Sequence, residues 1–293
     1  MFPDWHRFGI RLRPWLILGR VSNLPTVWSN CLAAWLLGGG GTLGRLLLLL
    51  LGATLIYVGG MWLNDAVDAP FDREFRPERP IPAGAVSPAD VWVGSAILLG
   101  VGAWLMSVWA GASGGWVMIL VSTVVVYDVI HKRVRFAPVL MGGCRLALFL
   151  AAGSASIDGI TGEIVWSAIV LGVFVVGLSF VARSESTGPS ASPWALACLM
   201  LPVLLAGLVN PPSEWFQAPV GPTVFCFVLV ILRSVSHLYR GHADSVRQTV
   251  GGLLAAIPWV DAVAVMAPPW PWAAAFVAAW ALSILLQRSV PAT

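Results

Sequence analysis

Long apolar segments, separated by short polar or glycine- and proline-containing stretches, run through most of this 293-residue sequence. Charged residues make up only 11% of the chain, against roughly 25% in soluble domains, and hydrophobic residues make up 58%. A soluble globular fold is therefore excluded. A disordered chain is excluded as well, because disorder requires low hydrophobicity and high charge. The pattern predicts an all-α fold, a polytopic bundle of transmembrane helices.

Ten apolar segments are candidate membrane spans, because a helical span needs about 20 mostly apolar residues. They cover residues 22–38, 45–63, 91–110, 114–130, 137–153, 163–182, 193–209, 219–236, 250–266 and 270–287. The last two are the weakest, since Pro258 and Asp261 interrupt one of them and a proline-rich turn separates the pair. We therefore expect nine or ten spans, which form one integral-membrane domain over residues 1–293.

Basic residues gather in alternate connections between the spans, and this pattern predicts the orientation in the membrane. With the N-terminus in the cytoplasm, the cytoplasmic segments hold Arg7 to Arg20, Arg73 to Arg79, Lys132 to Arg135, Arg183, Arg240, Arg247 and Arg288. The opposite side holds only Arg45. In a bacterium this is an inner-membrane protein with its N-terminus inside. No dense basic patch exists, so no nucleic-acid partner is expected. Four scattered cysteines without C-x-x-C spacing exclude a disulfide scaffold.

Five of the fourteen acidic residues fall in one short window after the second span: Asp65, Asp68, Asp72, Glu74 and Glu78. Asn64 and the three aspartates follow the pattern N-D-x-x-D-x-x-x-D. Positions i, i+3 and i+7 share one face of a helix, so the aspartates are expected to form a column of carboxylates. Such a column needs a counter-charge, which Mg²⁺ supplies together with water and substrate phosphate.

Arg73, Arg76 and Arg79 follow this column directly, and arginine donates bidentate hydrogen bonds to phosphate oxygens. The residues therefore indicate a Mg²⁺–diphosphate site at the cytoplasmic face of the membrane. The alternative is a solvated loop with internal salt bridges. Loops of that kind rarely begin with carboxylates at helical spacing inside the end of an apolar span.

N-D-x-x-D-x-x-x-D followed by E-R-P-I-P-A-G closely resembles the first aspartate-rich motif of the UbiA-type intramembrane prenyltransferases. G-R-V-S-N-L-P-T at residues 19–26 resembles the start of the family's first helix, where an arginine and an asparagine, here Arg20 and Asn23, approach the cavity. Y-D-V-I-H-K-R at residues 127–133 is similar to the family's Tyr and Lys-Arg element, here Tyr127 and Lys132. Pro70, inside the spacer before Asp72, departs from the family pattern, and a proline at this place can turn Asp72 away from the column.

The resemblance implies a helical bundle around a central cavity that opens to membrane lipids. A polyprenyl diphosphate enters the cavity, Mg²⁺ on two aspartate motifs grips the diphosphate, and the allylic cation alkylates a lipophilic acceptor, either aromatic or lipid. The implied site residues are Asp65, Asp68 and Asp72 for the metal, Asn64 to orient ligands, and Arg79 and Lys132 for the diphosphate. Arg20, Asn23 and Tyr127 are implied to contact substrate.

The family's second aspartate motif is replaced at residues 179–190 by S-F-V-A-R-S-E-S-T-G-P-S. Three interpretations remain open. Glu185 holds a metal with Ser184 or Ser186; or Arg183 replaces the second metal as the diphosphate's counter-charge; or the chain has lost catalysis and only binds or transports an isoprenoid lipid.

Arg145 lies inside the fifth span, where a charge costs roughly 3 kcal/mol or more, so we expect it to face the cavity and bind substrate. Two other classes of membrane protein are disfavoured. A CDP-alcohol phosphotransferase carries D-G-x-x-A-R ahead of its later aspartates, and the pattern around Asp65 lacks it. A channel or pump is disfavoured because only Arg145 is clearly buried in a span away from the inner face.

Overall fold

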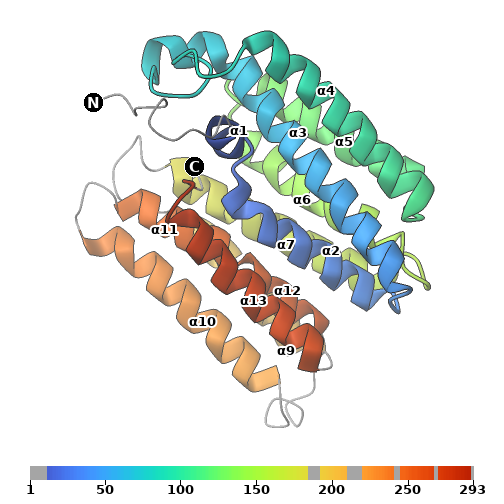
Figure 1. The fold of residues 1–293 in the computed structure, drawn as a ribbon. Coiled ribbons are helices and arrows are strands. Elements are labelled where there is room, and N and C mark those ends of the chain that lie inside the picture. The colour runs from blue at the N-terminus through green and yellow to red at the C-terminus, as the bar shows by residue number, and fades with distance from the viewer. Residues whose placement is uncertain (1–11, 184–191, 210–219, 241–244, 267–269, 292–293) are drawn as a thin grey trace.

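The computed structural model describes residues 12–183, 192–209, 220–240, 245–266 and 270–291, and all regular structure in these residues is helical. The predicted all-α bundle is confirmed (Figure 1). The helices are α1 (Arg13–Leu18), α2 (Leu24–Leu37), α3 (Leu43–Phe75), α4 (Pro88–Trp104), α5 (Gly114–Ile130), α6 (Ala137–Gly153), α7 (Gly162–Arg183), α8 (Pro193–Leu199), α9 (Leu201–Val209), α10 (Val220–Ser236), α11 (Ser245–Ala255), α12 (Ile257–Val265) and α13 (Trp270–Gln287). Short 3₁₀ turns at Val21–Asn23 and His237–Arg240 and a π-helical turn at Leu105–Trp109 extend three of them.

Each of the ten apolar segments expected to span the membrane is helical where the structure describes it. Two of them are broken. The seventh divides into α8 and α9, and the ninth divides into α11 and α12. In both cases the second helix carries a proline in its first turn, Pro202 or Pro258. Proline has no N–H to donate to the preceding turn, so a new helix begins there instead of continuing the old one.

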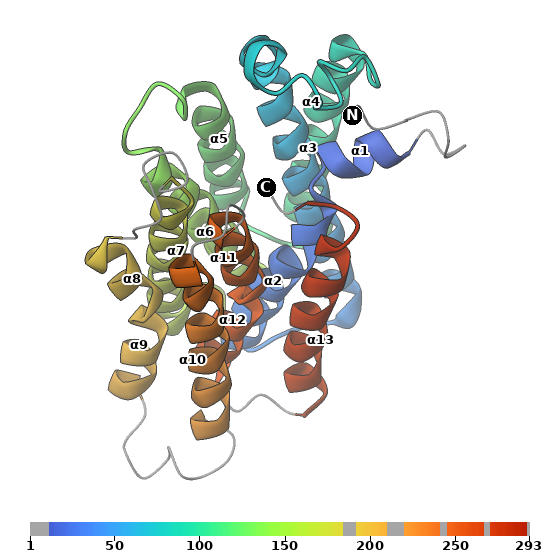
Figure 2. The same ribbon diagram turned by 90° about the vertical axis from the view of Figure 1, so that its left-hand side faces the viewer.

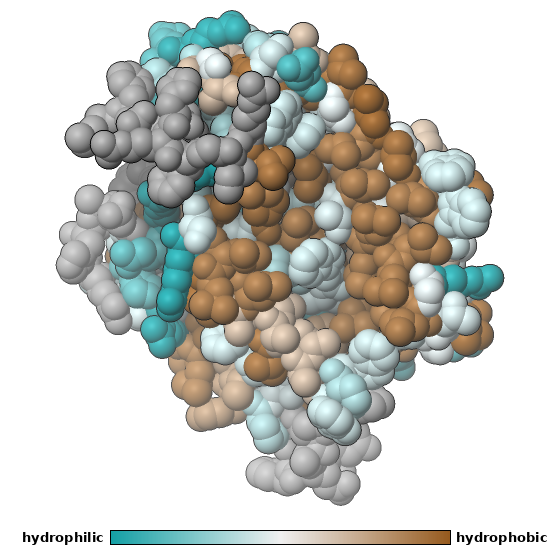
Figure 3. Space-filling model, viewed as in Figure 1, coloured by the Kyte–Doolittle hydropathy of each residue, from teal (hydrophilic) through white to brown (hydrophobic). Residues whose placement is uncertain are grey.

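Six helical segments among the described residues are long and apolar enough to cross a membrane: Leu43–Phe75, Pro88–Trp109, Gly162–Arg183, Val220–Tyr239, Ser245–Val265 and Trp270–Gln287. The helices α5 and α6 are apolar but shorter. Large apolar side chains such as Trp104, Val108 and Phe225 point outward and are exposed. Hydrophobic residues cover a broad central part of the face in Figure 3. The protein is therefore an integral membrane protein.

Glycines set the closest approaches between neighbouring helices. A Cβ atom on Gly102 of α4 would lie 2.7 Å from the carbonyl oxygen of Gly52 in α3. A Cβ atom on Gly142 of α6 would lie 2.5 Å from the carbonyl oxygen of Gly172 in α7. In a membrane, helices gain association energy from such close backbone packing, because lipid tails are as apolar as the side chains.

The connections that carry the polar residues lie at one end of the bundle. Figure 2 shows the α3–α4 connection (residues 76–87) and the α5–α6 connection (residues 131–136) at the upper end of the molecule. The last turns of α3, with the aspartates, lie at this end too (Figure 2). The helix ends thus bring residues that are far apart in the sequence to a common polar face.

Gly102→Leu is expected to lower the free energy of unfolding by about 1–3 kcal/mol, because the new side chain overpacks against the α3 backbone. Gly100→Leu is the matched control, since Gly100 lies on the same helix and a Cβ there meets nothing within 4 Å. Thermal unfolding of the two variants in detergent tests this expectation. Equal loss of stability in both would contradict the close packing of α3 against α4.

Candidate functional site

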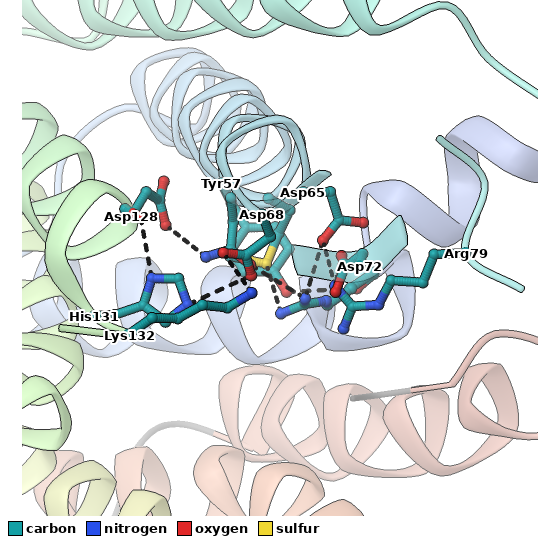
Figure 4. Close-up of polar contacts among 11 residues, drawn as sticks. Tyr57, Asp65, Asp68, Asp72, Arg79, Asp128, His131 and Lys132 are labelled. Atoms are coloured by element: carbon teal, nitrogen blue, oxygen red, sulfur yellow. Dashed lines mark hydrogen bonds and ion pairs between the residues drawn. The ribbon is translucent and has the colours of Figure 1, made fainter. Parts of the chain in front are cut away.

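Asp65, Asp68 and Asp72 lie on one buried face of the last turns of α3, with exposed fractions of 7%, 6% and 1%. Helix α3 continues through Pro70 to Phe75. One guanidinium nitrogen, Nη1 of Arg79, contacts Asp65 Oδ1 at 3.2 Å and Asp72 Oδ2 at 2.8 Å (Figure 4). Pro70 therefore does not turn Asp72 away from the column. Although a proline inside a helix often kinks or breaks it, α3 continues past Pro70 as far as Phe75.

Cations from three other parts of the chain meet these carboxylates. Arg20 Nη2 lies 3.3 Å from Asp65 Oδ1. Lys132 Nζ lies 2.9 Å from Asp68 Oδ1, and His131 Nε2 lies 3.5 Å from Asp68 Oδ2 (Figure 4). Burial lowers the pKa of His131, but its hydrogen bond with Asp68 and the charge of that carboxylate outweigh burial and leave the pKa above its ordinary value. The carboxylate column is thus neutralised within the protein.

A small apolar cluster next to the aspartates on α3 positions two of these cations. Ala66 and Ala69 of α3 pack with Leu18 of α1 and with Ile81 and Val86 of the α3–α4 connection. This packing holds two segments at the end of α3. One is α1, which is followed by Arg20, and the other is the α3–α4 connection, which contains Arg79. The backbone of Arg20 adopts a left-handed conformation with φ of 42°, which is costly for a residue with a side chain. Strain of this kind persists where the surroundings over-determine a conformation, often at functional sites.

Asn64 joins the column to the neighbouring helix α5. Its Nδ2 donates a hydrogen bond of 3.1 Å to Asp128 Oδ1, and its Oδ1 accepts one of 3.4 Å from Arg20. Asp128 is 1% exposed, and its Oδ2 is buried without a hydrogen-bond partner. Asp128 has no role among the sequence predictions. The feature that could have indicated one is its place directly after Tyr127, at the inner end of an apolar helix.

A cavity of about 370 Å³ opens beside this cluster, and its walls are mainly apolar side chains of α3, α5, α6 and α7. Five residues expected to bind substrate line it: Arg20, Asn23, Tyr127, Arg145 and Arg183. Asp128, His131 and Tyr57 line it as well. The three aspartates do not lie on its wall. They adjoin it through Arg20 and His131, so the charged cluster and the apolar cavity form one continuous site.

Arg183 ends α7 at the place where the sequence lacks an aspartate pair. Its Nη1 donates a hydrogen bond of 2.7 Å to the carbonyl oxygen of Arg135, and its Nη2 donates one of 3.4 Å to that of Val134. Arg183 therefore fixes the α5–α6 connection to α7 while it lines the cavity. Glu185, Ser184 and Ser186 lie outside the described residues.

Arg145 faces the cavity from the middle of α6, and its guanidinium donates to Asn30 and Thr26 of α2. Asn30 in turn bonds to Asp261 of α12. Asn30 and Thr26 are not among the residues predicted from the sequence, and Asp261 is predicted only to interrupt a span. Nothing in their spacing links residues so far apart in the chain.

The donor set at the end of α3 suits Mg²⁺. Carboxylate oxygens are its preferred protein ligands, and it takes one or two of them while it keeps water and substrate phosphate. Asp72 Oδ1 is buried and has no hydrogen-bond partner, so one carboxylate retains a free ligand atom. The described residues contain no group of three Asp, Glu, His or Cys side chains gathered around one point. The fit is thus to an ion that shares its coordination with a substrate, and it requires the aspartates to exchange their cationic partners.

Comparisons with known proteins match the chain to one family. The model of the UbiA prenyltransferase family matches residues 22–184, more than half of the chain. A digeranylgeranylglyceryl phosphate synthase from Methanoregula boonei is 35% identical over 91 residues, which are 30% of this chain and only 33% of that relative. The matched segment therefore spans about a third of the curated relative's length.

Solved structures share the fold at low sequence identity. An apo UbiA homologue from Aeropyrum pernix has a TM-score of 0.62 at 16% identity and covers 84% of this chain and 97% of its own. A UbiA homologue from Archaeoglobus fulgidus bound to GPP and Mg²⁺ has a TM-score of 0.60 at 13% identity, with coverages of 86% and 100%. A structure described for digeranylgeranylglyceryl phosphate synthase has a TM-score of 0.60 at 19% identity, with coverages of 87% and 97%.

Arg79→Gln is expected to lower the free energy of unfolding by about 1–3 kcal/mol, because it leaves two buried carboxylates without their shared cation. Magnesium chloride should restore more of this loss than sodium chloride of equal ionic strength, since the freed oxygens become metal ligands. Arg76→Gln is the control, because Arg76 is an exposed arginine of the same connection. Thermal unfolding in both salts is the measurement. The same loss in both variants, or no specific effect of magnesium, would count against this pairing.

Proposed function

The chain belongs to the UbiA prenyltransferase family, and from this we propose that it transfers a prenyl group from a polyprenyl diphosphate to a lipophilic acceptor inside the membrane. The observation that carries the proposal is the column of buried aspartates, paired with Arg20, Arg79, His131 and Lys132, at the edge of an apolar cavity. A charged headgroup site joined to an apolar cavity matches a substrate with a diphosphate head and a hydrocarbon tail.

Asp65, Asp68 and Asp72 would hold Mg²⁺, as in the sequence prediction. When bound, Mg²⁺ supplies Lewis-acid stabilisation of the departing diphosphate. Arg79, Lys132 and Arg20 are then released from their carboxylate partners and donate to the diphosphate oxygens. Because these donors are already positioned at the site, they stabilise the developing charge with little reorganisation.

The cavity wall serves the second half of the reaction. Its apolar side chains exclude water, which would otherwise capture the allylic cation. Tyr57 and Tyr127 add aromatic rings to this wall, and aromatic rings attract cations. Asn64 holds Asp128 and Arg20 in place and so keeps the headgroup site aligned with the cavity.

The same proposal places the N-terminus and the active site on the cytoplasmic side. Its support is the gathering of Arg79, Lys132 and Arg183 near the aspartates and the α5–α6 connection, together with the bias of basic residues toward cytoplasmic loops. The named relatives suggest the substrates. One is a digeranylgeranylglyceryl phosphate synthase and another was solved with GPP and Mg²⁺, so a lipid acceptor and a Mg²⁺-dependent prenyl donor are the first to test.

A second candidate function is binding or transport of an isoprenoid lipid without chemistry. The observation in its favour is at the end of α7, where Arg183 stands in place of an aspartate motif and contacts the carbonyl oxygens of residues 134 and 135. This candidate and the transferase share a binding site and differ in whether the C–O bond of the allylic diphosphate breaks.

Asp68→Ala is expected to lower prenyl transfer by about 100-fold or more, because it removes a metal ligand and the partner of Lys132. The assay follows a labelled allylic diphosphate into lipid-soluble product in membranes. Glu74→Gln is the matched control, since Glu74 is an exposed acidic residue of the same helix. Full activity of the Asp68→Ala variant would contradict the site assignment.

Release of inorganic diphosphate separates the two candidate functions. With farnesyl diphosphate, Mg²⁺ and a supply of acceptors, the purified transferase should release diphosphate, and a chelator should stop the release because the aspartates then lose their metal. A lipid-binding protein would bind farnesyl diphosphate and release none with every acceptor tried. That outcome would replace the transferase with the second candidate.

A further inference from the structure

Arg145 carries a charge in the interior of the bundle, on the wall of the cavity. Its guanidinium carbon lies 6.0 Å from the centre of the Tyr57 ring. Tyr57 precedes Asp65 by eight residues on α3, which is about 12 Å along a helix. Arg145 thus lies deeper in the bundle than the aspartate cluster. It lines the cavity apart from the ion pairs that Arg20, Arg79, His131 and Lys132 form with the aspartates.

A network of buried side chains fixes the orientation of this guanidinium. Nη1 of Arg145 donates to Asn30 Oδ1 at 2.8 Å, and Nη2 donates to Thr26 Oγ1 at 2.9 Å. The Asn30 amide is itself held by Asp261, since its Nδ2 donates to both carboxylate oxygens at 3.0 and 2.8 Å. Ser29 donates to Asp261 as well, at 2.6 Å. Helices α2, α6 and α12 together present Arg145 to the cavity.

The network leaves part of the guanidinium unused. Arginine has five N–H donors, and the contacts with Asn30 and Thr26 use two of them. Within the described ranges no carboxylate lies at salt-bridge distance from Arg145. Asp261, the nearest candidate, directs its oxygens to Asn30 and Ser29. Donors and charge thus remain for a ligand in the cavity.

In the proposed reaction, the charge of Arg145 bears on which acceptors the cavity can accept. An allylic cation formed in the same low-dielectric cavity is repelled by a bare guanidinium, because electrostatic interactions are strong where water is excluded. An acceptor with a negative charge neutralises Arg145, which removes this repulsion, and it holds the nucleophile near the cation. With a neutral acceptor the repulsion between Arg145 and the allylic cation remains.

We propose that Arg145 binds an anionic group of the acceptor, a carboxylate or a phosphate, and that Asn30, Thr26 and Asp261 are positioning residues for its guanidinium. This inference rests on the proposed prenyl transfer and specifies the class of acceptor. Arg145 suits the role because its planar fork pairs with two oxygens of either group at once.

Two pairs of probe molecules test this proposal. Within each pair, one member carries the anionic group and the other is a close analogue without it. The aromatic pair is 4-hydroxybenzoate and 4-hydroxybenzyl alcohol. The lipid pair is a 1-O-alkylglycerol 3-phosphate and the same 1-O-alkylglycerol without phosphate. Dissociation constants are measured by calorimetry with the full-length protein in lipid nanodiscs. The pair whose anionic member binds more tightly identifies the source of the charge, a small aromatic acid or a lipid headgroup.

Arg145→Gln keeps a polar side chain for Asn30 and Thr26 and removes the charge. It should weaken binding of the preferred anionic probe by about 10- to 100-fold and leave its neutral counterpart unchanged. Arg145→Lys should recover part of the affinity. Arg233→Met is the matched control, because Arg233 is an exposed arginine of α10, and it should bind both members as the natural protein does.

Binding of farnesyl thiodiphosphate with Mg²⁺ separates this inference from the proposed function. It should persist in Arg145→Gln and be lost in Asp68→Ala. Equal binding of anionic and neutral probes by the natural protein, or an unchanged preference in Arg145→Gln, would overturn the role of Arg145. Loss of all donor binding in the natural protein would instead overturn the proposed function. If Arg145→Gln does not fold, the preference of the natural protein within each pair decides the matter.

Discussion

Three carboxylates share one face of a helix end that is continuous with a membrane span, and this arrangement exists only because cations neutralise them. In a medium of low dielectric, an unpaired charge is costly enough to forbid the fold that buries it. The partners come from the turn after α1, from the α3–α4 connection and from the α5–α6 connection. The positions of these three connections at one end of the bundle therefore follow from the same requirement. The apolar parts of the helices, away from this end, carry no such requirement and are held together by packing.

Much of this architecture was predictable because its signals are local. Apolar segments of span length, the helical spacing of Asp65, Asp68 and Asp72, and the basic residues in alternate connections each lie within a short window of sequence. Most helix bounds follow the predicted segments for the same reason, although α3 continues beyond its predicted end at residue 63 to Phe75. The breaks before Pro202 and Pro258 also have local causes, although only the second was expected.

The unpredicted features depend on residues that meet only in three dimensions. Asp128 becomes part of the site because Asn64 of another helix donates to it. Asp261 read as an interruption of an apolar segment, yet it is buried among polar partners of α2. The direction of Asp72 after Pro70 stayed open, because the local effect of a proline does not reveal that Arg79, seven residues further on, holds that carboxylate beside Asp65. Pairings between distant segments are set by packing, which one sequence does not express.

The apolar cluster beside the aspartates gives small residues an unusual influence. Ala66 and Ala69 carry no charge, but α1 and the α3–α4 connection pack on them, and these two segments lead to Arg20 and Arg79. A methyl group added there is expected to move both guanidinium groups relative to the carboxylates. The volume of two alanines thereby sets the spacing of charges on the adjoining face of the helix, so the electrostatics of the site are tuned by steric means.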